Sequence, residues 1–575
     1  MKSNMSLLFI VLWLALPCLL FFCTSTIFLN AVLLVLSSAC FLIIALEIAS
    51  KKSIQSKYCF LIILFLIIIL VIFLIKIIPI QTVVNSVAIL AFSSVFIILG
   101  FKLPNTVTLK SIFFITFLES FLFLFTKISS SSLFYPNNSI LSILLSCQFA
   151  FLLPTVKNLI QKHYSNKNNL INILIVFLFC LILVFTGGRA GLISFTAILI
   201  IMYSKFFKIN LRAYKFFSLI ILLICFSFLF IKKVDSSNGR ILIYKVVFNN
   251  ITPSQLITGV GYGKFKVKYN HYQSNYFSTN PINSSEALLA GNTYFAFNDP
   301  FQLLVEIGII GLIIFIFLIL LLVKRFITDT RSNDLFNNPN LLGAYLCIFS
   351  FLFSSLFSYP FQVILILPIF LLAVAIIYNA GLPKTIIFSF NSKFTFKTIT
   401  FLSFFAATFL TLFFSLKYFS IYFKVKEAEK LALGGFKKRA ATIYAQMYND
   451  IIVAPNIYYP FAVELNKLNE IDSALIVLNK STTYIYNDFS AILLADLYYK
   501  KGQLNYADSF YSDAVFINPK SFRNRYALFT FYLETKQYTK ALFWGNSIIE
   551  LKPKIPSDVV TGIKNKTTKL LENIK

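Results

Sequence analysis

The chain has few of the charged residues that a soluble protein needs for its surface. They make up 13% of its 575 residues, and only 22 residues are acidic. Apolar residues make up 58%, more than a soluble fold can bury, so the sequence predicts a polytopic membrane protein. The 51 basic residues bring the net charge to +29, an excess that membrane proteins place in their cytoplasmic loops. No basic stripe with interleaved aromatic residues is present in a polar segment, so we do not expect nucleic acid as a partner.

Cysteine and histidine are also scarce where metal sites would need them. The chain contains no CxxC pair and no cysteine in its polar segments, which excludes a disulfide framework and a cysteine-type zinc site. Only two histidines are present, His163 and His271. The eight cysteines all lie in or beside apolar runs: Cys18, Cys23, Cys40, Cys59, Cys147, Cys180, Cys225 and Cys347.

Long apolar runs fill residues 1–416. Stretches of about 20 apolar residues, the length that crosses a bilayer as a helix, predict about 12 to 13 spans. The first span follows Lys2 and has no small-x-small cleavage site, so we interpret it as a retained signal anchor. The predicted spans are 5–23, 26–48, 58–79, 82–103, 108–127, 139–160, 168–186, 189–206, 213–231, 301–323, 339–357, 361–378 and 398–416.

The basic residues predict how these spans are oriented. With a cytoplasmic N-terminus, every second loop is basic and the loops between them are nearly bare, as the positive-inside rule requires. This orientation places a long polar loop, residues 232–300, on the outer side of the membrane. Its length and its Gly, Asn, Tyr and Phe content favour a folded lid over a linker. Cations at the outer ends of the spans and at the start of the long loop include Lys76, Lys127, Arg189, Lys232, Lys233 and Arg240.

The last part of the chain, residues 424–575, is mixed in composition and repetitive. Ala441, Ala474, Ala507 and Ala541 follow one another at intervals of 33, 33 and 34 residues. Small residues at such intervals let paired helices approach, and Gly502 suits the turn inside one pair. The pattern resembles tetratricopeptide repeats and predicts an α-solenoid, which the odd number of spans places on the outer side with the long loop. A repeat region of this kind suits a protein partner.

Two arginines on the outer side are candidate binding residues. Arg189 lies in the turn FTGGRAGL between two spans, and Gly188 leaves that turn open. Arg240 lies near the start of a predicted interfacial helix in NGRILIYK, and Gly261 and Gly263 follow it in an open GxGxG turn. Guanidinium groups hold phosphate oxygens with paired hydrogen bonds, so we expect the two arginines to bind the diphosphate of a lipid-linked substrate.

The order of these motifs resembles the O-antigen ligase family. FTGGRAGL, GRILIYK with its glycine turn, NHYQSNYF and FNDPFQLLVEIGIIG carry the resemblance, at 185–194 and 238–311. More narrowly, the chain is similar to Bacteroidetes-type members with C-terminal tetratricopeptide repeats. The resemblance implies a metal-independent, inverting glycosyltransferase without a cofactor. Such an enzyme transfers a glycan from undecaprenyl diphosphate to a hydroxyl of lipid A–core or of a protein.

The resemblance also implies where a general base would lie. Many members have a histidine directly before the asparagine that here is Asn298, but this chain has Phe297. The candidate bases are therefore Asp299, His271 and Glu306, and Asp299 is favoured because it occupies the motif. An O-antigen polymerase and a protein O-oligosaccharyltransferase remain alternatives, and more distant ones are a lipid-linked sugar transporter and a non-catalytic membrane scaffold.

Overall fold

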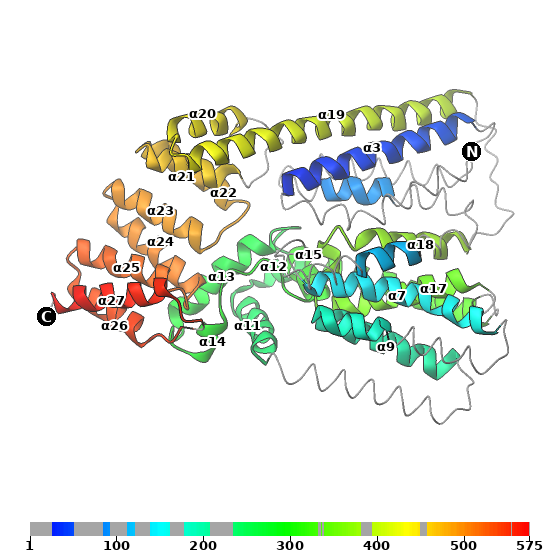
Figure 1. Cartoon of the computed structure of the whole chain (residues 1–575), viewed down its shortest axis with the longest axis horizontal. Helices are drawn as coiled ribbons and strands as arrows, with labels where there is room; N and C mark the ends of the chain where they lie inside the picture. The colour runs from blue at the N-terminus through cyan, green and yellow to red at the C-terminus, as the bar shows by residue number, and fades with distance from the viewer. Residues whose placement is uncertain are drawn as a thin grey trace. The chain divides into compact units, whose positions relative to one another are not determined.

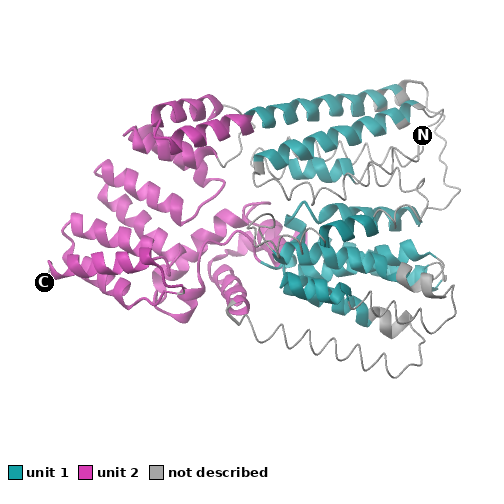
Figure 2. Cartoon of the chain, viewed as in Figure 1, with its two compact units in different colours: residues 1–232, 297–300, 313–420 teal, residues 233–296, 301–312, 421–575 magenta. Residues whose placement is uncertain are grey.

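The regular secondary structure in the residues that the computed structural model describes is all helical. The described residues are 26–50, 84–92, 112–120, 138–161, 178–206, 234–331, 335, 338–380, 394–448, 457–553 and 555–573, and they contain no strand (Figure 1). The prediction of an all-α chain is confirmed for this part. Contacts between backbone atoms divide the chain into two compact units, which Figure 2 colours separately. Unit 1 comprises residues 1–232, 297–300 and 313–420, and unit 2 comprises residues 233–296, 301–312 and 421–575.

Helices occupy most of the predicted apolar spans that the structure describes. Three segments are long and apolar enough to cross a membrane: Ile27–Leu46, Asp299–Arg331 and Phe401–Leu433. Residues 84–92, 112–120 and 178–186 are also helical. The predicted spans 5–23, 58–79 and 213–231 lie outside the described residues. The labelled helices at predicted spans are α3 (Thr26–Ser50), α7 (Asn138–Gln161), α9 (Arg189–Phe206), α15 (Asp299–Arg331), α17 (Pro339–Ser355), α18 (Leu367–Ala380) and α19 (Phe394–Leu433).

Small and hydroxyl-bearing residues hold three helices of unit 1 together. Ser146 of α7 hydrogen-bonds Ser194 of α9 at 2.8 Å and Ser350 of α17 at 2.7 Å, and all three side chains are buried. A Cβ on Gly343 of α17 would lie 2.3 Å from the carbonyl oxygen of Phe151 in α7. In an apolar surrounding, close backbone approach and interhelical hydrogen bonds replace hydrophobic burial as the source of helix association.

One predicted span is shorter in the structure, and another is interrupted. Within 361–378, the helix α18 begins only at Leu367, because the chain first forms the 3-10 turn η1 (Pro360–Gln362), which begins at Pro360. In α15, Gly308 has non-helical backbone angles, φ 76° and ψ −171°. The side chains beyond this break, such as Ile310 and Ile313, are largely exposed on the protein and apolar, as expected of a lipid-facing helix.

The predicted lid, residues 232–300, is described from residue 234 onward, and its residues 234–296 are largely helical and belong to unit 2. It contains α11 (Val234–Asn250), α12 (Pro253–Thr258), α13 (Phe265–Thr279) and α14 (Ser285–Leu289), which we call the loop helices. Tyr269, Tyr276 and Phe277 of α13 are buried, so the aromatic residues of the loop form a core.

The C-terminal part of unit 2 consists of antiparallel helix pairs, which we call the C-terminal hairpins. Within each pair the two helices pack on one another, and the buried Ala495, Ala507 and Ala514 allow the close approach. Gly435, Asn469, Gly502 and Lys536 all have positive φ and turn the chain at intervals of 34, 33 and 34 residues, so the predicted turn at Gly502 is confirmed. The helices are α20 (Lys437–Tyr448), α21 (Tyr458–Lys467), α22 (Ile471–Thr482), α23 (Asp488–Lys500), α24 (Leu504–Ile517), α25 (Phe522–Glu534), α26 (Tyr538–Glu550) and α27 (Asp558–Glu572).

Candidate functional site

Arg189 is the first residue of α9 and directly follows a tight turn. Thr186 closes that turn, because its hydroxyl donates to the carbonyl of Leu183 at 2.6 Å and accepts from the Gly188 N–H at 3.3 Å. The side chain of Arg189 is half-buried, and its Nη2 is buried with no hydrogen-bond partner among the described residues. A buried guanidinium nitrogen without an acceptor is costly, so this geometry suits an incoming anion. The N-terminus of α9 adds a favourable dipole for negative charge.

The glycines around Arg189 have two separate roles. Gly187 has φ 66°, and no atom lies within 4 Å of where its Cβ would be, so this residue both makes the turn and leaves it open. Gly188 is different, since a Cβ there would lie 2.1 Å from the side-chain oxygen of Ser142. Gly188 therefore allows close packing of the start of α9 on α7. The open space that the sequence led us to expect at Gly188 lies at Gly187 instead.

Arg240 lies in the second turn of α11, where the sequence places it near the start of a helix. Its side chain is half-buried. Lys245 of this helix forms an ion pair with Glu286 of α14, and its ammonium group lies 2.7 Å from that carboxylate. Tyr276 of α13 donates to the same carboxylate at 2.9 Å. These contacts raise the pKa of Lys245 and lower that of Glu286, and they hold α11 against α13.

The glycine turn is less open to a ligand than its sequence suggests, because its amides are bonded to α15. The N–H of Gly263 donates to Glu306 Oε2 at 3.0 Å and that of Phe265 to Oε1 at 3.3 Å, while the Gly261 N–H donates to the Glu306 carbonyl at 3.0 Å. Gln302 also donates to Oε1 at 3.1 Å. The Glu306 carboxyl group, 2% exposed, thus accepts three hydrogen bonds and anchors the turn.

The break in α15 allows this anchoring. A Cβ on Gly308 would lie 2.1 Å from the carbonyl oxygen of Ile257, and one on Gly259 would lie 2.1 Å from that of Glu306. The backbone segments around Gly259 and Gly308 are therefore in direct contact, and glycine at both positions leaves room for this approach. The Val260 N–H donates to the Val305 carbonyl at 2.9 Å, which satisfies an acceptor near the break.

The segment Phe297–Asp299 is held within unit 1 by the turn between α17 and α18. The side-chain amide of Asn298 donates to the Leu356 carbonyl at 3.1 Å. Asp299 is buried, and its Oδ2 accepts from the Phe361 N–H at 3.0 Å. Phe297 has φ 55°, a backbone conformation that is uncommon outside glycine, and its ring packs edge-on against Tyr359 at 5.3 Å.

His271 belongs to the surface of α13 that faces the C-terminal hairpins. Its ring stacks on Tyr486 with centroids 4.0 Å apart and planes 9° apart, while one edge stays exposed. This packing partly withdraws the imidazole from water and lowers its pKa. Asp513 opposes the shift and Lys268 adds to it. Among the described residues, no group of three or more His, Cys, Asp or Glu is arranged to hold a metal ion.

The apolar helices and the polar, arginine-bearing loop define a membrane protein. A family model described as O-Antigen ligase matches residues 174–316. The resemblance to the O-antigen ligase family is thereby confirmed for this segment, and the match supports a membrane enzyme of the ligase and polymerase type. The matched segment includes every candidate residue, from Gly188 to Glu306. None of the curated proteins compared with the chain matches it.

Proposed function

We propose that the chain is an O-antigen ligase-like glycosyltransferase. It transfers a glycan from undecaprenyl diphosphate to a hydroxyl of lipid A–core or of a protein, on the periplasmic face of a bacterial inner membrane. The O-antigen ligase match over residues 174–316 supports this class of reaction. The alternation of basic loops supports a multi-pass topology of about 12 to 13 spans with a cytoplasmic N-terminus and periplasmic loop helices and hairpins.

The observation that carries the proposal is the state of Arg189. Its buried Nη2 has no partner among the described residues, at a helix N-terminus, inside the segment that matches the family. A diphosphate oxygen supplies the missing acceptor and is stabilised by the guanidinium charge and the helix dipole. As the glycosidic bond breaks, negative charge grows on the departing lipid diphosphate, so the same contacts are strongest in the transition state.

We assign Arg240 to the same diphosphate and Asp299 to the acceptor hydroxyl. Asp299 is buried and oriented by the Phe361 N–H, and its carboxylate would take the proton as the hydroxyl attacks the anomeric carbon. Glu306 is the poorer candidate, because three donors already occupy its carboxyl group. His271 is the poorer candidate because its ring face is packed on Tyr486.

We also propose that the C-terminal hairpins form a tetratricopeptide-like solenoid, and the identity of the acceptor separates this proposal from its alternatives. The 33- to 34-residue interval of their turns supports a tetratricopeptide-like solenoid. A polymerase and a protein oligosaccharyltransferase use the same donor chemistry and differ in the acceptor. A gene deletion separates the three, because undelivered polymer on lipid indicates a ligase, single-repeat product a polymerase, and unmodified protein an oligosaccharyltransferase.

The arginine assignment is tested with purified full-length variants and a lipid-linked donor. We expect Arg189→Ala and Arg240→Ala each to lower transfer by about 10²–10³-fold, the usual effect of removing one oxyanion-stabilising donor. Lysine at either position retains charge without the paired geometry and should recover only part of the activity. Arg331→Ala, at an exposed arginine that ends α15, is the matched control. Full transfer by both alanine variants would refute the diphosphate assignment.

A further inference from the structure

The helix α13 buries polar side chains whose hydrogen bonds are only partly supplied by the loop, where Asn270 bonds Lys266 and Thr293, and Gln273 bonds Gly291. Asn270 and Gln273 are fully buried and Ser274 is 3% exposed. A buried amide or hydroxyl without a hydrogen bond is costly, so these residues specify what α13 must face. Each of the three side chains also donates to a group more than 200 residues later, in the C-terminal hairpins.

The partners of α13 belong to α24 and to the segment that precedes α23. The Asn270 amide donates to the Tyr486 carbonyl at 2.7 Å, and the Gln273 amide donates to the Ile517 carbonyl. Ser274 donates to Asp513 Oδ1 at 2.5 Å, while Tyr486 donates to the other oxygen of that carboxylate at 2.7 Å. One carboxylate thus joins a loop residue to a hairpin residue.

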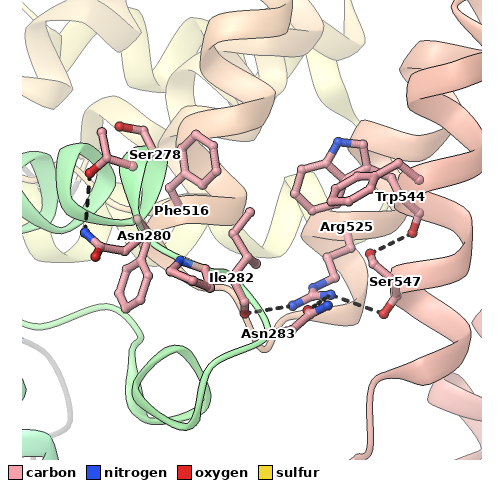
Figure 3. Close-up of a pocket in the computed structure, with 12 residues that line it drawn as sticks. Ser278, Asn280, Ile282, Asn283, Phe516, Arg525, Trp544 and Ser547 are labelled. Atoms are coloured by element: carbon pink, nitrogen blue, oxygen red, sulfur yellow. Dashed lines mark hydrogen bonds between the residues drawn. The ribbon is translucent and has the colours of Figure 1, made fainter.

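The end of the loop is held by a second set of contacts. Asn292 and Asp488 bond reciprocally, with the Asn292 amide donating to Asp488 Oδ1 at 2.7 Å and the Asp488 N–H donating to Asn292 Oδ1 at 3.2 Å. Arg525 is fully buried, and it donates to Asn283 Oδ1 at 3.1 Å and to the Ser547 carbonyl at 3.1 Å. Figure 3 shows this guanidinium between the loop and the hairpins, beside a cavity of about 440 Å³.

These contacts continue to the helix that carries Arg240. The helix α11 packs on α13, and both Lys245 of α11 and Tyr276 of α13 bond the carboxylate of Glu286. The position of α11 in unit 2 therefore depends on α13, and that of α13 depends on the hairpins.

We propose that the C-terminal hairpins act within the same chain as a positioning element for Arg240, an inference that rests on the proposed function. Asn270, Ser274 and Arg525 are positioning residues, and the surface formed by α24 and the start of α23 takes α13 instead of another protein. Opening this surface for a partner would break the hydrogen bonds that Asn270, Gln273 and Ser274 donate to the hairpins, so the form in which α13 is docked is the more stable one.

The test compares two asparagines on one helix in the full-length protein. Asn270→Ala removes the buried contact, whereas Asn275→Ala changes an exposed neighbour. We expect Asn270→Ala and Ser274→Ala to raise the KM for the lipid-linked donor by roughly tenfold with a smaller change in kcat, because the competent position of α11 becomes less populated. Ser274→Thr keeps the hydroxyl and should restore KM. Hydrogen exchange of α11 and α13 should speed up in the two alanine variants and not in Asn275→Ala.

The possible failures are distinguishable. If α13 exchanges faster in Asn270→Ala and the donor KM stays unchanged, the positioning role is overturned while the contact itself stands. If exchange of α11 and α13 in Asn270→Ala equals that in Asn275→Ala, the inference is also overturned. If Arg240→Ala transfers glycan normally, the proposed function fails instead. A protein that binds the hairpins and speeds exchange of α13 would show that the surface serves a partner, and would overturn the inference.

Discussion

The role of Glu306 can be decided by a substitution whose cost follows from its contacts. Glu306→Ala leaves the N–H groups of Gly263 and Phe265 buried without an acceptor. Each unsatisfied donor costs about 1–3 kcal/mol, so the glycine turn should lose about 4 kcal/mol of local stability. Glu306→Gln keeps one acceptor oxygen and should lose about 2 kcal/mol. Since about 1.4 kcal/mol corresponds to a tenfold change, the opening equilibrium should rise about 10³-fold and 30-fold, respectively.

Hydrogen exchange at the amides of Gly263 and Phe265 measures this opening in the protein held in a lipid nanodisc. Glu427→Gln is the control, since Glu427 of α19 is exposed and contacts neither amide. Glycan transfer is measured on the same samples. If Glu306 anchors the turn, Glu306→Gln retains part of the turnover and loses protection. Unchanged protection together with complete loss of turnover would refute the anchor and identify Glu306 as the base.

Two further predictions follow from the loop. Gly308→Ala and Gly259→Ala should each strongly destabilise unit 2, because a Cβ at either position would lie 2.1 Å from a backbone oxygen. Gly239→Ala, with nothing within 4 Å, is the control in thermal unfolding, and equal melting temperatures would contradict the close approach. Burial lowers the pKa of His271 below its ordinary 6.5, with Asp513 opposing and Lys268 assisting, so the folded state binds fewer protons than the unfolded state. The packing of neutral His271 on Tyr486 therefore stabilises the docking of α13 on the C-terminal hairpins above pH 6.5. This stabilisation is lost as the pH falls below 6.5. The protection of the α13 amides, corrected for the pH dependence of the intrinsic exchange rate, should fall as the pH drops from about 7.5 to 5.5, and less so in His271→Gln; equal protection profiles would refute this role.

Local patterns predicted the helices and the repeat turns of this chain well. The apolar residues Ile241, Tyr244 and Val247 indicated the helix that became α11, because helical periodicity is a property of neighbouring residues. The alanine interval likewise predicted the turn at Gly502, whose φ is 76°. The start of α18 was predicted too early, because hydropathy does not register the turn that follows Pro360.

The contacts of the candidate site were harder to predict, because they join residues far apart in sequence. The turn at Gly261 and Gly263 looked open, yet its amides bond Glu306, 43 residues after Gly263. His271 was a candidate base, and its stacking on Tyr486 depends on a residue in the hairpins. Arg189 could be identified from its charge and its position in a turn. The absence of a hydrogen-bond partner for its Nη2 among the described residues depends on the packing around the side chain, which the sequence does not predict.

The distance in sequence between the loop and the hairpins has a consequence for synthesis. Gln273 bonds a carbonyl 244 residues later. At about 5–20 residues per second, the ribosome takes roughly 12–50 s to produce that partner after the loop helix has emerged. During this interval the polar face of α13 has no hairpin to bind, and the loop is open to proteases and to holding chaperones. A nascent chain arrested before residue 486 should therefore be cleaved in the loop much faster than one released after residue 547.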